Sequence, residues 1–265
     1  MLETLLRHDR AIIATALGLL TALAWLALLQ GPGTGMSATA MTTWQFPPPR
    51  VTPAPGAWNA AYWLTMLTMW WVMMVAMMTP SAAPMILLYA RVARYAPGQS
   101  ASDGALGSTA AFAAGYLVCW LGFSLLAVGL QFALESRGLL DGMTMWSVNA
   151  WLTGALFIAA ALYQLSPLKA ACLTHCRSPA AFLARHRRPG TQGGFRLGLI
   201  HGAYCVGCCW VLMLLLFAAG IMNLVWIAGL AIFVLAEKLL PFGARLAAVT
   251  AGLLAAAGLY AILAA

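Results

Sequence analysis

Long apolar runs, interrupted by short polar stretches, make up most of the chain. A helix that spans a membrane needs roughly 20 consecutive apolar residues, and about seven runs match or approach that length. The predicted spans are Ala11–Leu29, Ala60–Tyr89, Thr109–Leu134, Val148–Leu168, Leu197–Met222, Leu224–Leu240 and Leu246–Ala264. The pattern therefore predicts an all-α fold, a polytopic transmembrane helical bundle of about seven spans.

Several runs carry further structural signals. The second contains Pro80 and Pro84, which remove backbone donors, so we expect it to kink or break there. The fifth and sixth runs meet at Met222 and Asn223, which predicts a tight helical hairpin. The first run is longer than the apolar core of a secretory signal peptide, which favours a retained helix.

Composition and charge support a membrane protein and set its orientation. The chain is 63% hydrophobic and 8% charged, whereas a soluble domain carries about 25% charged residues. Cytoplasmic loops are enriched in Lys and Arg, and an orientation with the N-terminus in and the C-terminus out leaves only Arg50 and Arg137 outside. Topology and anionic lipid then account for the net charge of +8 without a nucleic-acid partner. We expect one transmembrane domain over residues 1–265, in contact with the lipid bilayer.

Three cysteines lie close together in the fifth run, within the segment CVGCCWVLM. On a helix, His201, Cys205 and Cys208 fall within an arc of about 60°, and Cys209 and Met213 extend that face to about 140°. By the predicted topology no cysteine lies in an outer loop, which favours reduced thiols that can act as soft-metal ligands. Because cysteine also behaves as a small buried hydrophobe, core packing is the alternative interpretation.

The second run is rich in methionine, which is both a flexible core residue and a thioether ligand. Seven methionines lie between Met66 and Met85, and at helical spacing most of them form two adjoining stripes. Thioethers select Cu(I) among the common biological metals, whereas a methionine stripe on its own is typical of core packing. The candidate ligands in this run are Met73, Met74, Met77, Met78 and Met85.

The predicted inner loop contains the segment CLTHC, with Cys172, His175 and Cys176. If the fourth helix continues past Lys169, the two thiols share a face and the imidazole lies beside them. Three nitrogen and sulfur donors within five residues predict a second metal station for Cu(I) or Zn(II) at the cytoplasmic surface. The alternative is a pair of interfacial thiols beside a histidine that reaches toward water.

Glu237 is the one acidic residue inside a predicted span. An ionisable side chain at the centre of a membrane costs on the order of 3 kcal/mol, so it is a functional candidate by default. A carboxylate that faces the bundle interior could bind a metal or accept a proton. The alternative is an interfacial carboxylate that pairs with a nearby base.

Four segments resemble motifs of a family of bacterial proteins identified as predicted metal-binding integral membrane proteins. They are MMVAMMTPSAAPM at Met73–Met85, CLTHCRSPAAF at Cys172–Phe182, CCWVLM at Cys208–Met213, and Glu237–Lys238. The resemblance covers residues 62–241 and shows no departure within these motifs. It implies metal binding in the inner membrane of a bacterium, and it implies no particular reaction or substrate.

The sequence thus favours a membrane protein that binds a soft transition metal, with copper first, in metal handling, transport or delivery. A protein that donates or accepts the metal is the implied partner, and the oligomeric state is left open. One alternative is a metal- or thiol-dependent membrane redox enzyme component, although no catalytic set is evident. The other is a non-catalytic assembly or scaffold subunit whose Met and Cys side chains pack the core.

Overall fold

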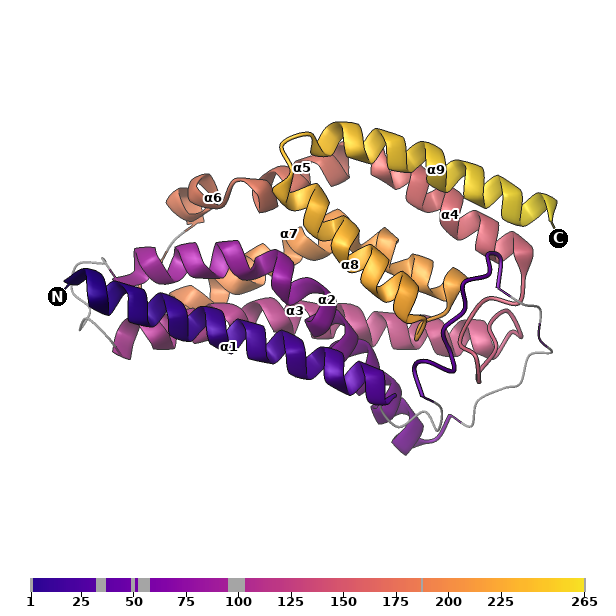
Figure 1. Ribbon diagram of the computed structural model, residues 1–265, viewed down its shortest axis with the longest axis horizontal. Coiled ribbons are helices and arrows are strands. Elements are labelled where there is room, and N and C mark those ends of the chain that lie inside the picture. The colour runs from indigo at the N-terminus through magenta and orange to yellow at the C-terminus, as the bar shows by residue number, and fades with distance from the viewer. Residues whose placement is uncertain are drawn as a thin grey trace.

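The computed structural model describes residues 2–31, 37–48, 51, 58–94, 103–186 and 188–264, and within these ranges the structure is built from helices without a β-strand (Figure 1). This confirms the predicted all-α class. The helices are α1 (Leu2–Gln30), α2 (Ala60–Arg94), α3 (Asp103–Glu135), α4 (Ala150–Gln164), α5 (Pro167–Arg177), α6 (Pro179–His186), α7 (Gly190–Ala219), α8 (Leu224–Leu239) and α9 (Gly243–Leu263).

Most of the long helices are apolar enough to cross a membrane. Five pass this test among the described residues, and the count rises to six if α4 and α5 form one bent span. The 16 residues of α8 fall short of the length required. The start of α1 and the end of α9 lie at opposite ends of the long axis (Figure 1).

One helix bends as the sequence predicts, and another ends earlier than expected. The helix α2 stays continuous through Pro80 and Pro84, and it changes direction along its length instead of breaking (Figure 1). The fourth helix does not continue past Lys169, because α4 ends at Gln164 and α5 turns away from it by 64°. Ser166 caps the new helix through the Lys169 amide, and proline occupies its first position.

The turn between α7 and α8 confirms the predicted hairpin. Gly220, with φ of 106°, ends α7 in a conformation that favours glycine. Asn223 then begins α8 by accepting a hydrogen bond from the Val225 amide. The connection is therefore only four residues long, between Ala219 and Leu224.

Glycine allows α3 and α7 to pack backbone to backbone in the centre of the bundle. A Cβ atom on Gly198 would lie 2.0 Å from the Phe112 carbonyl oxygen, and one on Gly194 would lie 2.4 Å from that of Ser108. Gly202 continues this row against Cys119. Small residues four apart permit close helix packing in membranes, and here they fix α3 and α7 side by side in parallel.

We predict that Gly198→Ala destabilises the protein, whereas Gly122→Ala does not. Both changes place a favourable alanine in a helix, but a Cβ atom at Gly122 has open space within 4 Å. Overpacking at Gly198 is expected to cost about 1–3 kcal/mol. Thermal unfolding of the two variants in lipid nanodiscs checks this, and equal melting temperatures would contradict the packing argument.

Candidate metal centre

Contacts near both ends of α2 and α7 set the register between these helices. The ring centroids of Trp70 and Phe217 lie 5.2 Å apart, and farther along, a Cβ atom on Gly194 would lie 2.9 Å from the Tyr89 hydroxyl. The helices therefore run antiparallel, and the middle of the methionine segment lies level with the α7 thiols. The predicted ligands Met73, Met74, Met77, Met78 and Met85 are all buried, between 0% and 3% exposed.

The predicted donor face of α7 is turned inward. His201, Cys205, Cys208, Cys209 and Met213 are each at most 2% exposed. The Cys208 and Cys209 thiols donate to the Cys205 carbonyl oxygen, at 3.2 Å and 3.0 Å. The sequence thus predicts the orientation of this face correctly, whereas metal ligation by it stays a prediction.

The bend between α4 and α5 carries the inner-loop thiols back against α7. The Cys176 thiol lies near the thiol of Cys208. The Cys172 sulfur lies 2.9 Å from where a Cβ atom of Gly207 would be, so a glycine inside CVGCC leaves room for it. The expected second station is therefore not separate, because its thiols adjoin those of α7.

His175 does not join this cluster in the structure. Its ring stacks on Tyr204 with centroids 4.1 Å apart, and its Nδ1 atom lies 2.8 Å from the Ala171 carbonyl oxygen. Among the described residues, no three His, Cys, Asp or Glu side chains form a ready-made metal group. Part of the reason is visible in α7, where two thiols point at a backbone carbonyl rather than at a common centre.

Lys238 is the feature of this region that the sequence analysis missed. Its Nζ atom lies in the interior, where it donates to Cys205 Sγ at 3.0 Å and to Ser81 Oγ at 2.9 Å. The Tyr116 hydroxyl is 3.1 Å from the same sulfur and donates to the Met78 carbonyl oxygen at 3.0 Å. A lysine inside an apolar helix was the available signal for Lys238, but Tyr116 and Ser81 have no comparable signal.

Glu237 occupies a different environment from its neighbour Lys238. Its carboxylate accepts hydrogen bonds from Lys169 Nζ at 2.7 Å and 2.8 Å and from Gln164 Nε2 at 3.0 Å. The Lys169 ammonium also donates to the Gln164 side chain. Both charged side chains are 2% exposed. Glu237 thus pairs with a base, as the alternative interpretation held, and both side chains are buried inside the bundle.

Three buried polar atoms near the cluster have no hydrogen-bond partner among the described residues. They are Thr79 Oγ1 on α2, Trp120 Nε1 on α3 and His201 Nδ1 on α7. The His201 ring lies among Phe112, Tyr116 and Phe182, with centroids between 5.5 Å and 5.9 Å away. A buried polar atom without a partner costs about 1–3 kcal/mol, so the imidazole nitrogen is suited to a ligand.

Fold and centre together define an all-helical protein whose apolar helices enclose a cluster of thiols beside a band of thioethers. The family model PpoB2, described as a copper chaperone, matches residues 67–261, and the chain belongs to this family. The matched region contains all four motifs of the sequence resemblance. Neither the comparison with curated proteins nor that with solved structures gave a match.

Glu237→Gln is expected to lower the free energy of unfolding by about 3 kcal/mol, because it leaves Lys169 as an unpaired buried charge. The double variant Lys169→Met/Glu237→Gln is expected to recover most of that loss, since no unpaired ammonium remains. Denaturant unfolding of both variants measures the difference. Copper content of the folded double variant then tests whether Glu237 is a ligand, and we expect it to equal that of the wild type.

Proposed function

We propose that this protein lies in a membrane and binds Cu(I) as cargo in its interior, in copper handling or delivery. The observation that carries the proposal is that the thiols of α5 lie against the thiol segment of α7. The Cys172 sulfur packs on Gly207, and the Cys176 thiol lies near those of Cys205 and Cys208. Membership of a copper chaperone family supports the choice of metal. The long apolar helices support membrane embedding.

The donor set suits a soft monovalent metal. Thiolates and thioethers select Cu(I), whereas carboxylates and carbonyls suit harder ions. We assign the primary ligands to the α7 thiols with Cys176, since small side-chain rotations away from the Cys205 carbonyl oxygen would turn two of them toward a shared ion. Additional ligands in this proposal are the His201 imidazole and the thioethers of six buried methionines, Met73, Met74, Met77, Met78, Met85 and Met213.

Charge balance favours a monovalent ion at this centre. Two thiolates with one Cu(I) carry one negative charge, and the Lys238 ammonium beside Cys205 makes the assembly neutral. The same thiolates with Zn(II) are neutral already, so Lys238 would add an uncompensated positive charge in a medium of low dielectric. We therefore assign Lys238 the role of a fixed counter-charge rather than that of a ligand.

The proposed transfer of copper between a partner protein and α7 rests on the position of the α5 thiols. Cys172 and Cys176 are partly exposed, whereas the α7 thiols are buried. Copper could pass between a partner protein and α7 by ligand exchange, in which one thiolate replaces another and the oxidation state of the metal does not change. Zn(II) at Cys172, His175 and Cys176 has weaker support, because the imidazole stacks on Tyr204 instead.

Replacing Cys208 and Cys209 together with serine is expected to abolish stoichiometric copper in protein purified from copper-replete cells without a metal-affinity tag. Hydroxyls are poor ligands for Cu(I). Cys119→Ser is the matched control, since its thiol donates to the Leu199 carbonyl oxygen at the α3–α7 contact, and it should keep its copper. Elemental analysis gives the result, and wild-type protein that holds no copper would favour the scaffold interpretation.

Lys238→Met is expected to weaken retention of Cu(I) by about tenfold or more, because unit charges about 4 Å apart interact by ~4 kcal/mol at an effective dielectric constant near 20. Lys238→Arg keeps the charge and should retain most of the affinity. Competition with a Cu(I) chelator measures both variants. The preference for Cu(I) over Zn(II) should also fall in Lys238→Met, which a loss of packing alone does not explain. An unchanged preference would remove Lys238 from the metal centre.

A further inference from the structure

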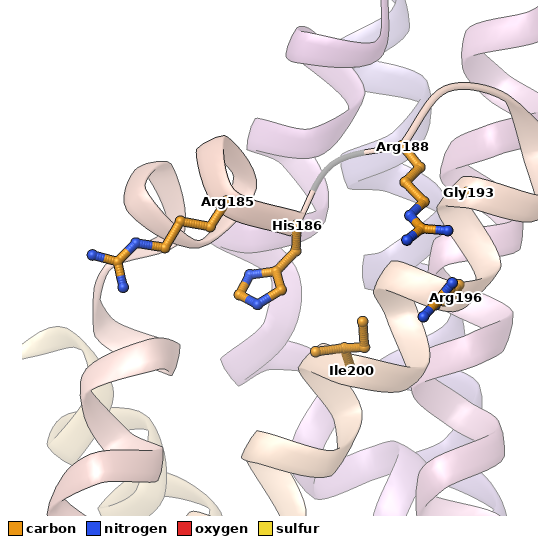
Figure 2. Close-up of a pocket in the computed structure, with 6 residues that line it drawn as sticks. All are labelled: Arg185, His186, Arg188, Gly193, Arg196 and Ile200. Atoms are coloured by element: carbon orange, nitrogen blue, oxygen red, sulfur yellow. The ribbon is translucent and has the colours of Figure 1, made fainter.

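A small cavity of about 160 Å³ opens between the end of α6 and the first turns of α7 (Figure 2). Its lining is unusual for a chain with so few charged residues. The lining residues are Arg185, His186, Arg188, Gly193, Arg196 and Ile200. Nothing in the proposed copper chemistry uses this site, and its positive charge would repel a free copper ion.

Two of the three arginine side chains lie close together here, and no acidic side chain is among the residues that line the cavity. Figure 2 shows Arg188 and Arg196 close together on the α7 side of the cavity, His186 at the end of α6, and Arg185 extending away from both. No Asp or Glu lines the cavity, and within the described part of the chain none of the three arginines takes part in an ion pair or hydrogen bond. Like charges that face each other are stabilised by an anion placed between them.

The backbone and the imidazole offer further donors to such an anion. The first residues of α7, from Gly190, have no side-chain cap, so their amide groups and the positive end of the helix dipole remain available. His186 Nδ1 lies 3.1 Å from the Phe182 carbonyl oxygen. Nδ1 therefore carries the proton of the neutral ring, and Nε2 donates to an anion in the cavity when the ring is protonated.

We infer that this cavity binds the phosphate group of an anionic ligand, and that the ligand is the headgroup of an anionic phospholipid. Arginine binds phosphate oxygens in pairs through its planar guanidinium. One apolar side chain, Ile200, lines the cavity beside the basic ones, and Phe195, next to Arg196 on α7, is 37% exposed outside it. Basic side chains next to exposed apolar ones suit an amphiphile, which brings acyl chains with its phosphate, better than they suit free phosphate. The site also lies at one end of a candidate membrane span, where headgroups are found.

The test uses the full chain in nanodiscs of phosphatidylcholine that contain a minor fraction of phosphatidylglycerol. After exchange into a neutral detergent, native mass spectrometry counts the phosphatidylglycerol molecules that remain bound. Arg188→Gln/Arg196→Gln should lower that retention by about tenfold or more, as the loss of charge-assisted hydrogen bonds implies. The matched control is Arg91→Gln/Arg245→Gln, which removes two exposed arginines outside the cavity and should behave as the wild type.

A second arm separates the two sources of phosphate. Titration of inorganic phosphate into phosphatidylcholine nanodiscs, followed by phosphorus NMR, should show no saturable binding if the ligand is a lipid. Saturable phosphate binding that Arg188→Gln/Arg196→Gln removes, without retention of phosphatidylglycerol, would overturn the lipid assignment. Equal loss of phosphatidylglycerol in both double variants would reduce the effect to general surface charge and overturn the site itself. Copper content should stay at the wild-type level in every variant, so this test and that of the copper proposal fail independently.

Discussion

The packing of this bundle depends on where its buried charged side chains lie. Two lysines, Lys169 and Lys238, lie in the interior, and Glu237 pairs with the first of them at 2.7 Å. Lys238 donates instead to a thiol and a hydroxyl. A buried ammonium without an anionic partner is strongly disfavoured in a medium of low dielectric. The fold therefore places the Lys238 ammonium beside the Cys205 sulfur. This contact is stabilising when the Cys205 sulfur is a thiolate.

The surrounding helices keep that arrangement in place. The glycine row of α7 brings α3 so close that the Tyr116 hydroxyl reaches Cys205, and the pair of Lys169 with Glu237 ties α5 to α8. The bend before α5 returns Cys176 to Cys208. Glycine packing, a buried ion pair and a capped bend thus act on one centre, although they lie far apart in the sequence.

The sequence was sufficient for properties that depend on local pattern. Apolar runs predicted the helical class, and helical spacing predicted that His201, Cys205, Cys208, Cys209 and Met213 share a buried face. The sequence was not sufficient to predict how the helices are oriented relative to one another. The sequence analysis expected one continuous run through Leu168, whereas Ser166 and Pro167 begin a new helix at a bend of 64°. The angle of this bend decides whether the α5 thiols form a separate station or meet α7. Likewise, Glu237 and Lys238 are adjacent in sequence yet face different helices, a division that only the packing of α5 and α2 against α8 determines.

The two ligand sites that we propose differ in exposure and in charge. The α5 thiols are partly exposed and the α7 thiols are buried, so a metal on a partner protein would meet α5 first. The arginine-lined cavity beside α6 excludes cations from a neighbouring surface, which leaves the α5 side for them. Phe182 lies between these regions, because its ring contacts His186 at 4.8 Å and His201 at 5.5 Å. In our two proposals, the short helix α6 therefore lies between a site for the phosphate of an anionic ligand and a centre for a soft cation.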